Sequence, residues 1–383
     1  MRRYDALMAT AALLVTANST VTVLLTQHQG LQLATTVLRL AAFAALWRTL
    51  PRAVHAPRSW LPLTSYSAGL FALFGDGGVG GINGWIWLPK CAPIADYTAA
   101  DITGWVLTAS SSGLILWVWC TTARDHHRPA GHPPVAISVA GTAALAAGVW
   151  WTAATILNHM TGAHRWCDAL TDQVWSPLHQ IAGWSLAGLN EELAFTGLGL
   201  AMLLRARRSV AAAGLIVNVF VRLSLHLYYA NHQTVLLWLA WAACWSGIGL
   251  LCTLAIGRRA LAHGMPLGRC VVTCTLGVAV THSLYDLLPG PLFTSVAVVF
   301  GGCAVVLWAF PLGERPFSWI CSRSPWQLVV DAFNALANLT RRRTLADQTK
   351  TDGPDGKAAP LHAGASSDGP GVPEDDSRRP TAT

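Results

Sequence analysis

The sequence predicts an all-α, polytopic membrane protein: a bundle of about ten transmembrane helices followed by a disordered C-terminal tail. Of the 383 residues, 53% are hydrophobic and only 12% are charged, whereas soluble domains carry about a quarter charged residues. The apolar residues also fall in blocks of roughly 20, the length that a helix needs to cross a bilayer. These two observations exclude a soluble globular domain.

The predicted transmembrane segments follow one another along most of the chain. Nine apolar blocks indicate spans directly: 7–26, 32–50, 103–121, 135–157, 176–204, 209–229, 234–256, 267–288 and 290–311. A further block near 61–88 is interrupted by the glycine-rich run from Gly75 to Gly84. We expect a helix over about 61–75 and then a re-entrant or outer segment, which protein must shelter because lipid cannot bond free backbone groups.

Composition divides the chain into four regions. Residues 1–175 are N-terminal transmembrane helices, and 176–312 form a transmembrane core that carries the polar motifs described below. Residues 313–346 place apolar side chains at helical spacing, which is typical of an amphipathic segment on the membrane surface. Residues 347–383 are rich in Gly, Pro, Ser, Asp and Thr, a composition that predicts a disordered cytoplasmic tail.

Basic residues predict the orientation. If the N-terminus is cytoplasmic, the predicted inner loops hold eleven arginines and the outer loops hold only Lys90 and Arg165. This positive-inside bias, with an even number of spans, predicts a multi-pass protein of the plasma membrane with both termini in the cytoplasm. The formal charge of +7 is accounted for by topology, so we expect membrane lipid and no nucleic acid as a partner. The eleven are Arg48, Arg52, Arg58, Arg124, Arg128, Arg205, Arg207, Arg208, Arg258, Arg259 and Arg269.

Two of the nine cysteines differ from the rest. Cys91 and Cys167 fall in predicted outer loops, whereas most of the others lie inside spans. The outer face is the oxidising compartment in which disulfides persist. A Cys91–Cys167 disulfide is therefore one alternative, and two free thiols are the other, because the sequence gives no separation between them.

Ionisable residues inside predicted spans are functional candidates, because a bilayer core penalises them. These residues occur in three pairs. Glu192 directly follows Glu191, whereas His226 follows Arg222, and Asp286 follows His282, by four residues, which is one helical turn. At 1.5 Å rise per residue, Glu191, His226 and His282 lie roughly 20, 25 and 22 Å above the inner ends of their spans. The full set is Glu191, Glu192, Arg222, His226, His282 and Asp286.

Each cluster taken alone has an equally good structural explanation as a hydrogen bond between helices. Their matched depth on three spans favours a shared site instead. A carboxylate there can take a proton from water, and imidazoles can polarise a carbonyl or stabilise an oxyanion.

These residues resemble the motifs of the CPBP group of intramembrane proteases, which includes CAAX prenyl endopeptidases and bacteriocin-processing or immunity proteins. The family pattern is Glu-Glu-x-x-x-Arg, then an aromatic or basic residue followed by x-x-x-His, then His-x-x-x-Asn/Asp, on successive hydrophobic helices. The matching segments are Glu191-Glu192 through Gly197, Arg222-Leu-Ser-Leu-His226 and His282-Ser-Leu-Tyr-Asp286. The resemblance covers about residues 176–290.

The resemblance implies an intramembrane endopeptidase that hydrolyses a peptide bond near the membrane, in a peptide or membrane-protein substrate. It implies that Glu191 is the general base of the Glu191-Glu192 motif, that His226 is its partner, and that His282 with Asp286 forms the oxyanion side. Two alternatives stay open for the cofactor. Zinc would be held by Glu191, His226 and His282; a glutamate protease would need no metal, and the lack of a His-Glu-x-x-His helix favours this second alternative.

The chain departs from the family at Thr196, which stands where the motif has Arg. We expect Arg222 to compensate by neutralising Glu192 from the next span, since an intramembrane Arg needs a counter-charge. Without that compensation the protein would be a non-catalytic scaffold or an immunity-like relative. Asp286 in place of Asn is a smaller departure. A transporter is a third class, but the single glycine break does not give the paired broken helices that transporters show.

Overall fold

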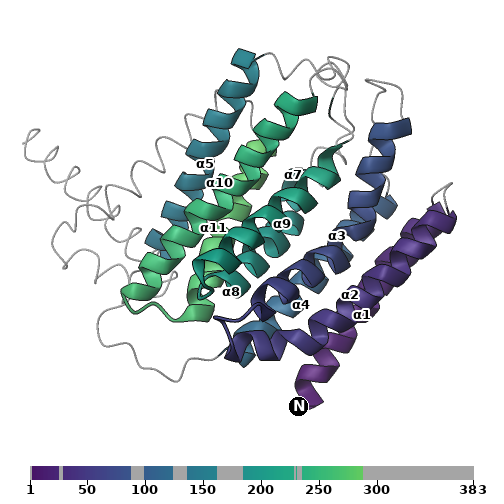
Figure 1. The fold of residues 1–383 in the computed structure, drawn as a ribbon, viewed down its shortest axis with the longest axis horizontal. Coiled ribbons are helices and arrows are strands. Elements are labelled where there is room, and N and C mark those ends of the chain that lie inside the picture. Colours follow the sequence, from purple (N-terminus) through teal and green to yellow (C-terminus); the bar gives the residue numbers. More distant parts are fainter. Residues whose placement is uncertain are drawn as a thin grey trace, which may run out of the picture. The chain divides into compact units, whose positions relative to one another are not determined.

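The structure is a computed structural model that describes residues 2–25, 29–87, 99–123, 136–161, 184–227, 230 and 235–287. Within these ranges it is entirely helical, with nine helices if one interrupted helix counts once (Figure 1). The elements are α1 (Arg2–Leu25), α2 (Gln29–His55), α3 (Leu61–Trp87), α4 (Ala99–Thr122), α5 (Ala136–Thr161), the interrupted helix α7 (Trp184–Glu192), η3 (Leu193–Leu198) and α8 (Gly199–Leu203), then α9 (Arg208–His226), α10 (Val235–Ala262) and α11 (Leu267–Leu287).

Six of these helices are long and apolar enough to cross a membrane: α1, α2, α4, α9, α10 and α11. By this criterion the chain is a multi-pass membrane protein. Nine of the ten predicted spans coincide with described helices. The predicted span 290–311, the surface segment, the tail, and both Cys91 and Cys167 lie outside the described residues.

The prediction that helical structure stops near residue 75 was wrong. Helix α3 continues through the glycine-rich run to Trp87, so its backbone groups bond within the helix. The glycines serve packing instead. A Cβ atom on Gly81 would lie 2.1 Å from the carbonyl oxygen of Ser224 on α9, whereas one on Gly80 would meet nothing within 4 Å. Small residues thus let α9 approach α3 closely, as in other membrane helix pairs.

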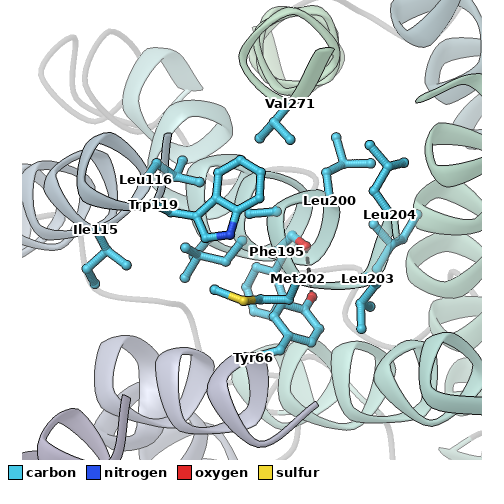
Figure 2. Packing of buried hydrophobic residues seen from close by; sticks show 14 of the residues in the cluster. Tyr66, Ile115, Leu116, Trp119, Phe195, Leu200, Met202, Leu203, Leu204 and Val271 are labelled. Carbon is cyan, nitrogen blue, oxygen red and sulfur yellow. Dashed lines mark hydrogen bonds between the residues drawn. The ribbon is translucent and has the colours of Figure 1, made fainter. Parts of the chain in front are cut away.

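The interrupted helix α7–η3–α8 is the centre of the described bundle. It contacts α3, α4, α9, α10 and α11, and every residue from Ala194 to Leu203 is buried. Figure 2 shows side chains of α3, α4 and α11 packed around it, among them Tyr66, Trp119 and Val271. At its C-terminal end, the guanidinium of Arg258 donates to the carbonyl of Leu204 at 3.2 Å, which satisfies a group that the helix end leaves free.

A buried ion pair joins the first three helices. Arg39 of α2 is fully buried and forms a salt bridge with Asp76 of α3. Its remaining donors reach the carbonyls of Ala72 and Leu73, at 2.8 and 3.1 Å, and the hydroxyl of Ser19 on α1, at 2.8 Å. A guanidinium bonded in this way can stay charged inside the membrane, because each of its three nitrogens has at least one partner.

Candidate functional site

Three helices supply the candidate site. Helix α7 carries Glu191 and Glu192 at its C-terminal end, α9 carries Arg222 and His226, and α11 carries His282 and Asp286. In its C-terminal half, helix α9 carries polar side chains on its inner face and apolar ones on its outer face. Asn218 and Arg222 are buried, whereas Ile216 and Phe220 are exposed, as expected of a helix with lipid on one side.

Glu192 is the centre of the buried half of the site. Its carboxylate forms an ion pair with Arg222 and accepts a hydrogen bond from the hydroxyl of Thr196. Nδ1 of His282 lies 2.8 Å from its Oε1. The side chain of Glu192 is only 1% exposed. Thr196 and Arg222 therefore both bond the carboxylate that a motif Arg would neutralise.

Glu191 and His226 form the accessible half. Nε2 of His226 lies 3.4 Å from Oε1 of Glu191, and Arg222 Nε donates to the other oxygen of Glu191 at 3.3 Å. Nδ1 of His226 lies 2.9 Å from the carbonyl oxygen of Arg222. A carbonyl only accepts, so Nδ1 carries the hydrogen and Nε2 faces Glu191. The side chains of Glu191 and His226 are 14% and 30% exposed, so this pair is more open than Glu192 and His282.

Asp286 completes the cluster on the side of His282. Its Oδ2 lies 3.5 Å from Nε2 of His282, and its side chain is 26% exposed. His282 thus lies between two carboxyl groups, Glu192 and Asp286. Together with Glu191 the cluster holds three carboxyl groups and one guanidinium, and Glu191 and Glu192 contact that guanidinium directly. The cluster becomes neutral when it binds two protons, and a low-dielectric site favours neutrality.

Aromatic rings enclose the buried half. The guanidinium of Arg222 lies over the rings of Phe195 and Trp245, with 4.6 and 4.7 Å to their centroids. The ring of His282 is edge-on to Trp151 and Trp245, at 5.1 and 5.6 Å between centroids. Such cation–π and edge-to-face contacts hold charged and polar groups in orientation while excluding water. Trp151 on α5 and Trp245 on α10 were not expected from the sequence at this site.

A glycine allows Glu192 to reach His282. A Cβ atom on Gly188 of α7 would lie 2.6 Å from the backbone nitrogen of Ser283 and 2.7 Å from the carbonyl oxygen of Ala279 on α11. Without that atom the two backbones come together one turn before Glu192 and beside His282.

The geometry does not fit a tightly held zinc ion. Within the described residues, no group of three His, Cys, Asp or Glu side chains is arranged to hold a metal. Of the three ligands implied by the resemblance, Glu191 and His226 face each other, whereas His282 bonds to Glu192. The guanidinium of Arg222 also contacts both glutamates. A metal ion would need the same carboxylate oxygens as ligands.

All six intramembrane residues singled out in the sequence thus lie in one connected cluster. Comparisons with protein-family models, curated proteins and solved structures found no match for this chain.

Proposed function

We propose that the protein is an intramembrane endopeptidase of the CPBP type, which hydrolyses a peptide bond with a water molecule activated by Glu191. The observation that supports this most is the division of the cluster. Glu191 and His226 are in contact and partly exposed, whereas Glu192 and His282 are buried behind them. A general base needs access to water and an anchored geometry, and the mutual contact and partial exposure of this pair support that role.

The reaction follows from these positions. Glu191 takes a proton from a water molecule, whose oxygen bonds to the carbonyl carbon of the substrate. The carbonyl oxygen becomes an oxyanion beside His282 and Asp286, where hydrogen bonds donated by the imidazole ring and by the protonated form of Asp286 would stabilise it. The carbon–nitrogen bond then breaks, and the proton held by Glu191 passes to the leaving amine, with His226 as its partner. Arg222 and Glu192 take no proton in this scheme and hold the reacting groups in place.

A non-catalytic membrane scaffold is the second candidate. The observation that favours it is that Arg222 contacts both Glu191 and Glu192, so each carboxylate has a structural role in joining α7 to α9. In that case the cluster would serve only to hold α7, α9 and α11 together, as polar groups do in other membrane bundles.

The test is peptide hydrolysis by the purified, full-length protein in liposomes, supplied with a mixture of membrane-spanning peptides. Mass spectrometry would detect new amino termini, and heavy-oxygen water would label the new carboxyl termini. We expect Glu191→Gln to lower turnover by at least about 10²-fold, the scale of general-base catalysis, with an unchanged yield of folded protein.

The matched control is Asp101→Asn, which removes an exposed carboxylate at the start of α4 and should leave turnover unchanged. Absence of cleavage by the wild-type protein, or an equal loss of folded protein and activity in Glu191→Gln, would favour the scaffold.

A further inference from the structure

A buried hydrogen-bond chain lies beside the ionisable cluster without being part of it. It joins Tyr66 of α3, Asn218 of α9 and Ser246 of α10, all of them buried. Asn218 Nδ2 donates to the Tyr66 hydroxyl at 2.7 Å and to the carbonyl oxygen of Phe195 at 3.2 Å. The Tyr66 hydroxyl donates to the same carbonyl at 2.8 Å, as Figure 2 shows. Ser246 donates to Oδ1 of Asn218 at 2.7 Å.

The chain ends on the π-helical segment η3. In an α-helix the N–H of Gly199 would bond to the carbonyl of Phe195, four residues earlier. Here that N–H donates to the carbonyl of Thr196. The carbonyl of Phe195 is therefore met by side chains, and a buried carbonyl without partners would be costly. Tyr66 and Asn218 supply two donors to this carbonyl at the irregular turn.

Two members of this hydrogen-bond chain, Phe195 and Asn218, each lie one helical turn from a residue of the candidate site. Phe195 follows Glu191 by four residues, and its ring lies under the guanidinium of Arg222. Asn218 precedes Arg222 by four residues on the same face of α9, where both are buried. The chain therefore connects the backbone next to the glutamates with the helix that carries their partners.

We propose that Asn218, with Tyr66 and Ser246, is a positioning residue that keeps η3 in its π-helical form. In that form Glu191 and Glu192 both point toward Arg222 and contact it. A π segment holds one residue more than the α-helix that would replace it. If η3 relaxed to a regular α-helix, α7 and its two glutamates would turn about the helix axis relative to α8 by the angle of one residue, roughly 100°. Both carboxylates would then lose their present partners. This inference rests on the proposed function for its effect on catalysis, but not for its effect on structure.

The test uses full-length protein with nitrogen-labelled histidine rings, assigned through His226→Gln and His282→Gln. We expect Asn218→Leu to shift the NMR signals of both rings and to lower kcat by about 10²-fold, the scale of a small misplacement of catalytic groups. Tyr66→Phe removes one of the two donors to Phe195 and should shift the same signals by less.

The control is Thr253→Val, which removes a buried hydroxyl of α10 that bonds to Gly249 of its own helix and should change neither readout. Histidine signals that match the wild type in both Asn218→Leu and Tyr66→Phe would overturn the positioning role, even in an active peptidase. If the variants shift the histidine signals but the wild-type protein cleaves no peptide, the positioning role is upheld and the proposed function is overturned. If Asn218→Leu does not fold, Tyr66→Phe decides.

Discussion

At the scale of the residue, Arg222 decides how the glutamates are arranged. The sequence could predict its pairing with Glu192, because an intramembrane guanidinium needs a counter-charge and the motif Arg is replaced by Thr196. It could not predict the second contact, with Glu191. Adjacent residues of a helix point about 100° apart, so one partner for both was not expected. Nor could it predict the rings of Phe195 and Trp245 that enclose the guanidinium, because they come from other helices.

The first prediction concerns this ion pair. Arg222→Ala leaves the buried carboxylate of Glu192 without its guanidinium counter-charge and should destabilise the protein by about 3–5 kcal/mol. Adding Glu192→Gln should recover much of that loss, because neither charge then remains buried without a partner. Thermal unfolding in detergent of the wild type, the two single variants and the double variant gives the coupling free energy.

The second buried pair supplies a matched control. Arg39→Ala should be rescued by Asp76→Asn, its own partner, and not by Glu192→Gln. Additive effects of Arg222→Ala and Glu192→Gln, or rescue of Arg39→Ala by Glu192→Gln, would contradict specific pairing. Arg39 itself could have been found in the sequence, since it interrupts the apolar block 32–50.

At the scale of the element, the expectation that glycine would end helix α3 was wrong. Glycine weakens helices in water, and that rule predicted a break after residue 75. In a bilayer, helices instead use small residues for close contact, and Gly77 and Gly81 both face α9. The π segment η3 was also missed, because the donors that stabilise it are Tyr66 and Asn218 of other helices. The positions of most other helices could be predicted from apolar length alone.

The next prediction compares two adjacent glycines of α3. Gly81→Ala should destabilise the protein by about 1–3 kcal/mol, the scale of an overpacked contact, because the new methyl group would meet the backbone of Ser224. Gly80→Ala should be neutral or stabilise by up to about 1 kcal/mol, because alanine favours helix and its methyl group meets open space. Thermal unfolding in detergent measures both. Equal effects of the two variants would mean that α9 does not pack on this face.

At the scale of the whole described bundle, the charges divide its two ends. Apart from the buried Arg39 and Arg222, every described arginine lies at or near the N-terminus of α1, α9 or α11, or the C-terminus of α2, α8 or α10. For helices that alternate in direction these termini share one end, and Arg258 of α10 bonds to the end of α8. His226 ends α9 and Asp286 nearly ends α11, so the accessible half of the site lies toward the other end. Charge predicted this polarity from the sequence, but which helices adjoin one another depended on packing.

The last prediction tests that polarity in cells. The positive-inside rule places the arginine-rich end in the cytoplasm, so the turn after α10 should be inside and the start of α4 outside. His263 and Ala99 are exposed at these two places. In a background with Cys91→Ser and Cys167→Ser, a membrane-impermeant maleimide should label Ala99→Cys in intact cells. It should label His263→Cys only after the cells are permeabilised. The reverse pattern would put the site's open end in the cytoplasm. With the expected pattern, a substrate of the proposed endopeptidase would have to reach Glu191 and His226 from the outer half of the membrane.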